Sequence, residues 1–325
     1  MGNHVHLLLK EGREPLSNFM KREEKGVSLL GPDPHYSLLL INNKTKGKFV
    51  MKNTIQKDSM KTRKSIRTYT GEKISAIDKE KIINYLNNDE NLAGINGNKI
   101  KIQLIEIGEN ISGRIGTYGI IKNAPAFLIV TCKNNRDIML DCGYVFERLL
   151  LYLEQNGLGT CWLGGTFNRK KLSKDIKLSS GEIIPIISPV GYSNKKRSLS
   201  DKMIRTFTKG DSRINFDELF FNENFNHNIK DPDIRETLEM VRLAPSASNK
   251  QPWRVLIDAN GDAHFFIKRT PNYSREKFSY DIQWLDIGIS IAHYEIAFGC
   301  REFIVNASKI DSVPDSLEYV ITAKK

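Results

Sequence analysis

The sequence predicts two long helices, and both open with the same Asp-x-Gly pattern. Residues 141–156 start with Asp-Cys-Gly, and residues 286–298 start with Asp-Ile-Gly. A pattern that recurs after about 145 residues is typical of two related structural units. Acidic residues favour helix N-termini in general, so the repeat carries weight only together with the elements around it. On this basis we expect two half-domains in one chain.

The hydrophobic periodicity around these helices predicts an α+β fold, an α/β sandwich made of two halves. In the first half we expect two helices and three strands, at residues 75–86 and 141–156 and at 99–107, 126–132 and 183–190. In the second half we expect two helices and three strands, at residues 233–242 and 286–298 and at 254–258, 264–268 and 317–322. The predicted domain boundaries are 1–50 for a separate N-terminal segment, 51–205 for the first half, 206–227 for a connector and 228–325 for the second half.

The composition is that of an ordinary globular protein, with 40% hydrophobic and 27% charged residues. No apolar run approaches the ~18 residues of a membrane span, and the N-terminus lacks the layout of a signal peptide. We therefore expect a cytoplasmic protein without a membrane partner. Each of the four cysteines lies in or beside an apolar run, which predicts buried, reduced thiols: Cys132, Cys142, Cys161 and Cys300.

The net charge of +11 is compatible with a nucleic acid, an anionic ligand or a solvated surface. Lysine and arginine are spread along the chain, with one concentration at residues 44–64. A solvated surface is therefore our default interpretation, and a phosphate-bearing ligand would use a few of these charges.

A first motif, residues 63–67, combines three cations and a hydroxyl: Arg63, Lys64, Ser65 and Arg67. Arginine offers a planar fork for phosphate, lysine a point charge and serine a short donor. The motif therefore suits an anion, although a basic surface stretch before a helix would look the same.

A second motif, residues 244–253, crowds hydrogen-bonding side chains between two prolines and a tryptophan. Its polar members are Ser246, Ser248, Asn249 and Gln251, and Pro245 precedes them. Small residues let the backbone approach a planar ligand, and amides match a ring edge that carries donors and acceptors. A third motif, residues 157–167, contains Leu163, Gly164 and Gly165, where a glycine pair can lie against a flat ring.

These three motifs together resemble those of the nitroreductase family. More specifically, residues 55–325 look like the single-chain "putative TM nitroreductase" branch, in which the basic motif opens the first half and the serine-asparagine motif lies in the second. The resemblance implies FMN as cofactor, NAD(P)H as electron donor and a small-molecule electron acceptor such as a nitroaromatic or quinone, reduced by a ping-pong mechanism. It names no catalytic side chain, because the cofactor supplies the chemistry.

The same resemblance assigns roles to the motif residues. Arg63, Lys64, Ser65 and Arg67 would hold the phosphate, ribityl chain and pyrimidine edge of FMN, and Arg213 would add a phosphate contact. Ser246, Ser248, Asn249 and Gln251 would line the flavin with Pro245 packed nearby, and Leu163, Gly164 and Gly165 would approach the ring face. Each half carries only some of these pieces. We therefore expect a monomer that acts as an internal pseudo-dimer with one complete FMN site.

The N-terminal segment resembles a fragment of the HUH tyrosine transposases of small insertion sequences. His4 and His6 alternate on a predicted strand, as the metal-binding histidine pair of that family does. No helix with the family's nucleophilic tyrosine follows, and Tyr36 lies in a proline-bounded stretch at the wrong distance. We interpret residues 1–50 as a non-functional fragment and nucleic-acid binding as the alternative function. A flavin-binding protein without turnover is a third possibility.

Overall fold

The computed structural model describes residues 55–107, 115–194, 212–271, 273, 279–300, 302–305, 310 and 312–325. The chain divides into two compact units, Met1–Met51 and Lys52–Lys325, and all described residues belong to the second. The expectations for the N-terminal segment, including the histidine pair His4 and His6, lie outside the described residues.

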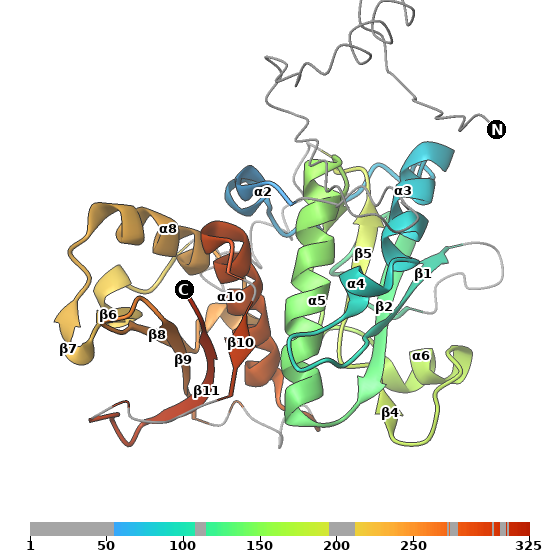
Figure 1. Cartoon of the computed structure of the whole chain (residues 1–325). Helices are drawn as coiled ribbons and strands as arrows, with labels where there is room; N and C mark the ends of the chain where they lie inside the picture. The colour runs from blue at the N-terminus through green and yellow to red at the C-terminus, as the bar shows by residue number, and fades with distance from the viewer. Residues whose placement is uncertain are drawn as a thin grey trace, which may run out of the picture. The chain divides into compact units, whose positions relative to one another are not determined.

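Two helices, α5 (Arg136–Gln155) and α10 (Ile282–Phe298), pack against each other in the middle of this unit (Figure 1). Both start before the residues at which the sequence placed their N-termini. The Asn135 side chain caps α5 by accepting a hydrogen bond from the N–H of Ile138, at 3.1 Å. The repeated aspartates, Asp141 and Asp286, therefore lie inside the helices and do not cap them. Gly157 and Gly299 follow the two helices with φ of 78° and 76°, as helix-terminating glycines do.

The helices cross at two glycines that allow the backbones to touch. A Cβ built on Gly143 would lie 2.0 Å from the carbonyl oxygen of Leu285, and one on Gly288 would lie 2.0 Å from that of Leu140. The contact is reciprocal, since the same sequence spacing relates each residue to its counterpart on the other helix. Only glycine permits such an approach.

A mostly buried antiparallel sheet covers the outer side of α5. Its strand order is β1-β2-β5-β3, with β4 paired to β2, and its members are β1 (Lys101–Glu106), β2 (Ala126–Lys133), β3 (Gly159–Thr160), β4 (Glu182–Ile183) and β5 (Ile187–Gly191). The single strand expected at 183–190 is wrong. It splits into β4 and β5, which flank Pro185, a residue without an N–H for a ladder bond.

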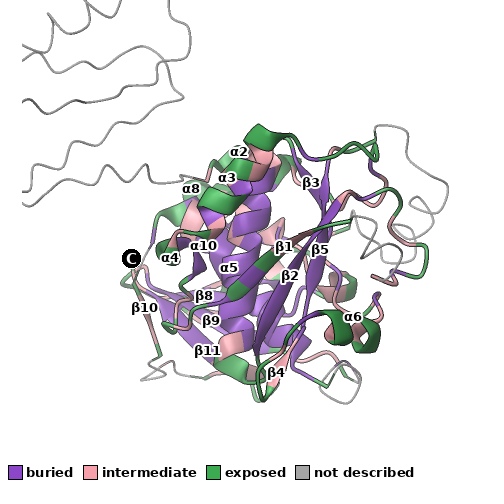
Figure 2. Ribbon diagram, turned by 90° about the vertical axis from the view of Figure 1, so that its right-hand side faces the viewer, coloured by how far each residue is buried: buried purple, intermediate pink, exposed green. Residues whose placement is uncertain are grey.

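Four helices lie around this first sheet and along the rim of the unit: α2 (Lys57–Thr62), α3 (Ala76–Leu86), α4 (Asp89–Leu92) and α6 (Arg169–Asp175). The prediction of α3 is confirmed, including its cap, because the Ser75 hydroxyl accepts a hydrogen bond from the N–H of Asp78 at 3.1 Å. Figure 2 shows that α2, α3 and α6 carry the exposed faces, whereas α5, β2 and β5 are buried.

The second sheet lies on the outer side of α10 and has the order β10-β11-β9-β8-β6-β7. Its strands are β6 (Phe220–Asn222), β7 (Asn224–Asn228), β8 (Trp253–Ile257), β9 (Ala263–Lys268), β10 (Phe303–Ile304) and β11 (Leu317–Ala323). Only the β6–β8 pair is parallel among the described strands. The helix α8 (Pro232–Arg242) packs beside α10. The described part of the expected connector, residues 212–227, also contributes β6 and most of β7.

One continuous hydrophobic core joins both sheets through the central helices, and it includes residues of α5, α10, β2 and β8. All four cysteines are free and buried, as the sequence predicts. No helix of the described part combines the length and the apolar character that crossing a bilayer requires.

Candidate functional site

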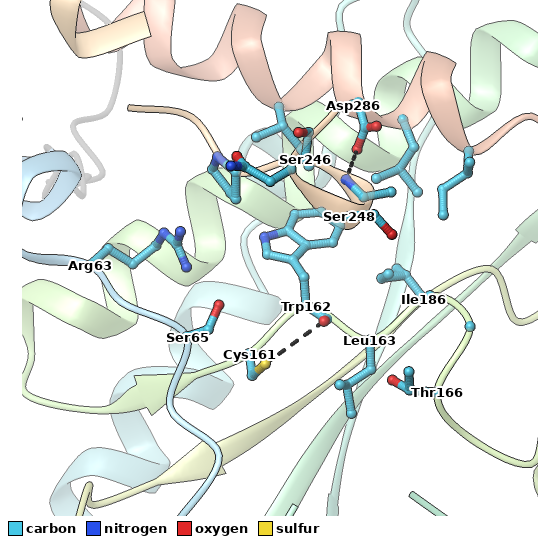
Figure 3. Close-up of a pocket in the computed structure, with 18 of the residues that line it drawn as sticks. Arg63, Ser65, Cys161, Trp162, Leu163, Thr166, Ile186, Ser246, Ser248 and Asp286 are labelled. Carbon is cyan, nitrogen blue, oxygen red and sulfur yellow. Dashed lines mark hydrogen bonds between the residues drawn. The ribbon is translucent and has the colours of Figure 1, made fainter. Parts of the chain in front are cut away.

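A cavity of about 550 Å³ opens between the two halves of the second unit, and all three sequence motifs reach it. The lining includes every predicted site residue except one, namely Arg63, Lys64, Ser65, Arg67, Leu163, Gly164, Gly165, Arg213, Pro245, Ser246, Ser248 and Asn249. Gln251 does not line it. Figure 3 shows Arg63 and Ser65 on one side of the Trp162 indole, and Ile186 and Thr166 on the other.

The basic motif is fastened to the strand that precedes the glycine pair. Ser65 pairs with Thr160 of β3 as an isolated bridge, and the N–H of Ile66 donates to the carbonyl of Thr160 at 2.8 Å. A Cβ on Gly159 would lie 2.8 Å from the Ile66 side chain, so glycine is needed for this close approach. The first and third motifs therefore form one continuous wall.

Arg63 of the basic motif has a side chain that is only 6% exposed. Its Nε lies 3.4 Å from Oε1 of Glu147 in the middle of α5. Its Nη1 is buried and has no hydrogen-bond partner among the described residues. Because buried guanidinium donors are normally paired, this atom points to a ligand that supplies an acceptor.

Glu147 is fully buried and accepts from three sides. The Trp162 indole N–H donates to Oε2 at 2.6 Å, and Nε2 of His293 on α10 lies 3.0 Å from Oε1. With Arg63 as the third partner, Glu147 fixes two cavity-lining side chains and ties them to the second half. Sequence reasoning missed this carboxylate, because a single acid inside an apolar helix pattern gives no signal of its partners.

The serine-asparagine loop has an unusual backbone. Ser248, Asn249 and Gln251 have φ of 48°, 54° and 47°, in the left-handed region that non-glycine residues seldom adopt. Such conformations persist only when surrounding contacts hold them, and they cluster at functional sites. Here the holding contacts include the Ser246 hydroxyl, which accepts from the N–H of Gln251 at 2.8 Å, and Oδ1 of Asp286, which accepts from the N–H of Ala247 at 2.9 Å.

Gln251 lies behind the loop and braces the chain that carries Arg213. It is 2% exposed, and its Oε1 accepts from the N–H of Ile214 at 3.1 Å. Arg213 donates to the Asn249 side-chain oxygen at 3.4 Å and to the carbonyl of Leu243 at 3.1 Å. Arg213 and the loop thus form one bonded group, and the place of Gln251 fits a supporting role.

The glycine pair is oriented by donors from both halves. The carbonyl of Gly164 accepts from Nη2 of Arg169 at 2.6 Å and from the hydroxyl of Tyr280 at 3.1 Å. Arg169 also donates to the carbonyls of Ile184 and Pro185. With its carbonyl fixed on this side, the glycine segment has a defined orientation at the cavity.

The remaining wall is apolar and comes from residues that the sequence did not single out. These are mainly Ile120, Ile186, Ile282, Leu285 and Ile289. Buried aliphatic residues on a helix look like core in a sequence, so nothing marked the α10 residues as cavity lining. Tyr273 also lines the cavity, and its hydroxyl lies 2.7 Å from that of Ser248.

The chemistry of the lining is that of a site for an elongated ligand with an anionic end and a planar apolar body. Arginine and lysine side chains from the basic motif and Arg213 supply the positive charge, and the aliphatic wall supplies the flat apolar surface. FMN has both features, and the unpaired Nη1 of Arg63 adds a donor for it. Among the described residues, no three histidine, cysteine, aspartate or glutamate side chains gather as a metal ion would need.

Comparison with known proteins identifies the family. The model of the family described as "Putative TM nitroreductase" matches residues 55–298, about three quarters of the chain. The chain belongs to this family. Nitroreductases are oxidoreductases, and the chain is an enzyme of that class. No curated protein matches it.

One solved structure shows the shared fold, and two further solved structures match part of the chain. A putative nitroreductase from Thermotoga maritima has 18% identity and a TM-score of 0.51, with 87% of this chain and 98% of that chain covered. An FMN-dependent nitroreductase from Clostridium difficile has 18% identity and a TM-score of 0.34, with 44% and 92% covered. A putative NADH oxidase from Clostridium acetobutylicum has 24% identity and a TM-score of 0.35, with 43% and 90% covered.

Proposed function

We propose that the cavity binds one FMN and that the enzyme uses it to pass electrons from NAD(P)H to a small acceptor such as a nitroaromatic or a quinone, in a ping-pong reaction. The observation that carries the proposal is the convergence of the basic motif, the serine-asparagine loop and the glycine pair on one cavity of about 550 Å³. When bound, the flavin supplies the two-electron chemistry that links the donor to the acceptor.

The residues of this chain would bind and orient the cofactor. Arg63, Lys64, Arg67 and Arg213 provide cations for the phosphate and for the ring edge that becomes negative on reduction. Ser246, Ser248 and Asn249 offer hydroxyl and amide groups to the ring and the ribityl chain, with Pro245 packed beside them. Leu163, Gly164 and Gly165 form the wall against which a ring lies flat, and Gln251 supports the loop from behind.

We also propose that the two halves act as an internal pseudo-dimer in a monomer, so that one chain needs no partner for a complete site. The reciprocal contacts of the two central glycines support this, because they relate α5 and α10 by the same spacing in sequence. We propose a cytoplasmic location from the free, buried cysteines, which suit a reducing compartment.

The decisive experiment is an absorbance spectrum of the purified full chain together with quantitation of released FMN. The proposal predicts a flavin spectrum and about one FMN per chain. Two FMN per chain would contradict the single site. The double variant Ser248→Ala with Asn249→Ala should lose most of the flavin, whereas Ser180→Ala, at an exposed turn that does not line the cavity, should retain it. Oxidation of NAD(P)H with a quinone or nitroaromatic then separates an enzyme with turnover from a protein that only stores flavin.

A further inference from the structure

Asp286 on α10 and Asp141 on α5 are counterparts in the two halves. Leu140 and Leu285 are counterparts at the helix crossing, as are Gly143 and Gly288. The same number of residues separates Asp141 from Asp286. Both residues are buried, Asp141 with 0% and Asp286 with 1% exposure. Each also bonds to the N–H of a loop that precedes a strand of its own half. The surroundings of Asp286 can therefore be compared directly with those of Asp141.

In the first half, both oxygens of the Asp141 carboxyl group accept hydrogen bonds from other residues of the protein. Oδ1 of Asp141 accepts from the N–H and the side chain of Asn96, at 3.0 and 3.1 Å. Oδ2 accepts from the N–H and the side chain of Asn98, at 3.3 and 2.8 Å. This aspartate has a structural task, which is to hold residues 94–98 against the helix.

In the second half, only one oxygen of the Asp286 carboxyl group has a hydrogen-bond partner among the described residues. Oδ1 of Asp286 accepts from the N–H of Ala247, and Figure 3 shows this bond above Ser248. Oδ2 is buried and has no hydrogen-bond partner among the described residues, and Asp286 lines the cavity. An unpaired buried oxygen is unfavourable, so its presence at a cavity wall indicates a partner on the ligand.

The environment of Asp286 settles which kind of partner fits. Burial raises the pKa of this carboxyl group well above its usual range, the nearby Asp281 raises it further, and the Ala247 N–H opposes both effects. Burial therefore favours the neutral form of this group. With Oδ1 accepting from Ala247, the proton resides on Oδ2, which becomes a hydrogen-bond donor to the cavity.

We propose that Oδ2 of Asp286 donates a hydrogen bond to an uncharged acceptor atom of the ligand held in the cavity, while Oδ1 fixes the serine-asparagine loop against the same ligand. This inference rests on the proposed FMN site. The acceptor is a carbonyl oxygen or ring nitrogen of the flavin, or an oxygen of the oxidising substrate. Asp286 thus contacts the ligand directly, in addition to shaping the loop.

The test compares the affinity of the apoprotein for FMN, measured by quenching of flavin fluorescence, among variants of the full chain. Asp286→Asn keeps one acceptor and one donor and should bind FMN as the original chain does. Asp286→Ala should bind about 10-fold more weakly, as expected for the loss of one hydrogen bond. The matched controls Asp141→Asn and Asp141→Ala should change thermal stability and leave FMN affinity unchanged.

A second background separates ligand contact from loop support. Ala247→Pro removes the N–H that bonds to Oδ1, and proline suits this position because it is the first residue of a helical turn. If Asp286 acts only through Ala247, adding Asp286→Ala to Ala247→Pro has no further effect on FMN affinity, and a contact with the flavin is excluded. If it contacts the flavin, the double variant binds FMN about 10-fold more weakly than Ala247→Pro alone.

The two possible acceptors are distinguished by a titration of the oxidised holoprotein with 4-nitrobenzoate, which needs no turnover. Unchanged FMN affinity with weaker nitrobenzoate binding in Asp286→Ala assigns the contact to the substrate. Unchanged affinity for both ligands overturns the proposal, as does an equal loss in Asp286→Asn and Asp286→Ala, because an ionised carboxylate would then be required. If the original chain binds no FMN, the proposed function itself fails, which is a different result from any of these.

Discussion

Gly143 and Gly288 each face the backbone of the opposite central helix, where an added Cβ would lie 2.0 Å from a carbonyl oxygen. Backbone atoms cannot move aside as a flexible side chain can, so any larger residue must push α5 and α10 apart. Since those helices carry Glu147, His293 and Asp286, the crossing also sets the distance between the two walls of the cavity.

Gly288→Ala should therefore lower the free energy of unfolding by about 2 kcal/mol or more, because overpacking forces backbone shifts. Urea denaturation measures this loss. Asp137→Ala, at an exposed position of α5, should stay within about 0.5 kcal/mol of the original chain. An unchanged denaturation midpoint for Gly288→Ala would mean that the helices do not cross this closely.

Arg63→Gln should weaken FMN binding by a factor of about 10 to 100, the range expected when a charged hydrogen-bonding group is lost. The FMN affinity of Arg63→Lys should lie between those of the original chain and Arg63→Gln, since lysine restores the charge without the planar fork. Fluorescence titration at two salt concentrations gives the affinities. Lys79→Gln, on the exposed face of α3, is the control for a general loss of positive charge and should bind FMN normally.

Glu147→Gln should lower the free energy of unfolding by roughly 3 kcal/mol, because it leaves the buried Arg63 guanidinium without its counter-charge. Thermal unfolding of the apoprotein measures this, with fluorescence as a second signal, since the Trp162 indole loses a charged partner. Glu106→Gln removes a carboxylate from an exposed pair with Lys79 and should cost less than about 1 kcal/mol. Equal losses in the two variants would contradict the buried network.

Asp286 should make stability depend on pH in a specific direction. Burial raises its pKa in the folded state, whereas in the unfolded chain it ionises near pH ~4. As the pH rises above that value, the folded state holds a proton that the unfolded state has released, so stability falls until the pH passes the folded-state pKa. Stability relative to Asp286→Asn should decline by up to about 1.4 kcal/mol per pH unit over that window. Parallel curves for the two proteins from urea titrations would disprove this.

Tyr280→Phe should cost about 1 kcal/mol of stability per hydrogen bond lost and should weaken FMN binding, because the Gly164 carbonyl keeps only Arg169 as donor. The single hydroxyl proton is shared between the carbonyls of Gly164 and Pro185, at 3.1 and 2.7 Å. Tyr118→Phe, at a side chain that is 71% exposed, is the matched control. Retention of both stability and FMN affinity in Tyr280→Phe would remove the role assigned to this clamp.

The two central helices and the main strands followed from local patterns, whereas α2, α4, α6, β6, β7 and β10 were not expected. The motifs and the family resemblance supplied twelve of the residues that line the cavity. Strong periodicity predicted α3, α8, β2 and β11, because each of them buries one face or both. Helix starts were harder to place, since Asn135 caps α5 through its side chain while Asp141 looked like the N-terminal acid. The single strand expected at 183–190 was wrong because the chain breaks at Pro185. A proline interrupts a strand only where the neighbouring strand needs its N–H, and the sequence does not show which strand that is.

Site residues without a local signal could not be predicted. Glu147 and Asp286 act through partners that are distant in sequence, such as His293 on the other central helix and Ala247 on the loop. Isoleucines of α10 become cavity lining only because the first half leaves them uncovered there. Gln251 shows the opposite case, since its motif indicated a lining residue and the fold places the side chain behind the loop.

The two walls of the cavity are covalently linked, since Arg63 and Ser248 belong to one polypeptide. If the site needs no second chain, as we propose, its assembly is a unimolecular event that does not depend on protein concentration. Dilution then does not separate the two walls of the cavity. A cofactor site shared between separate subunits, in contrast, is lost when the protein concentration falls below the dissociation constant of the dimer. The affinity of this chain for its cofactor should be the same at nanomolar and at micromolar protein.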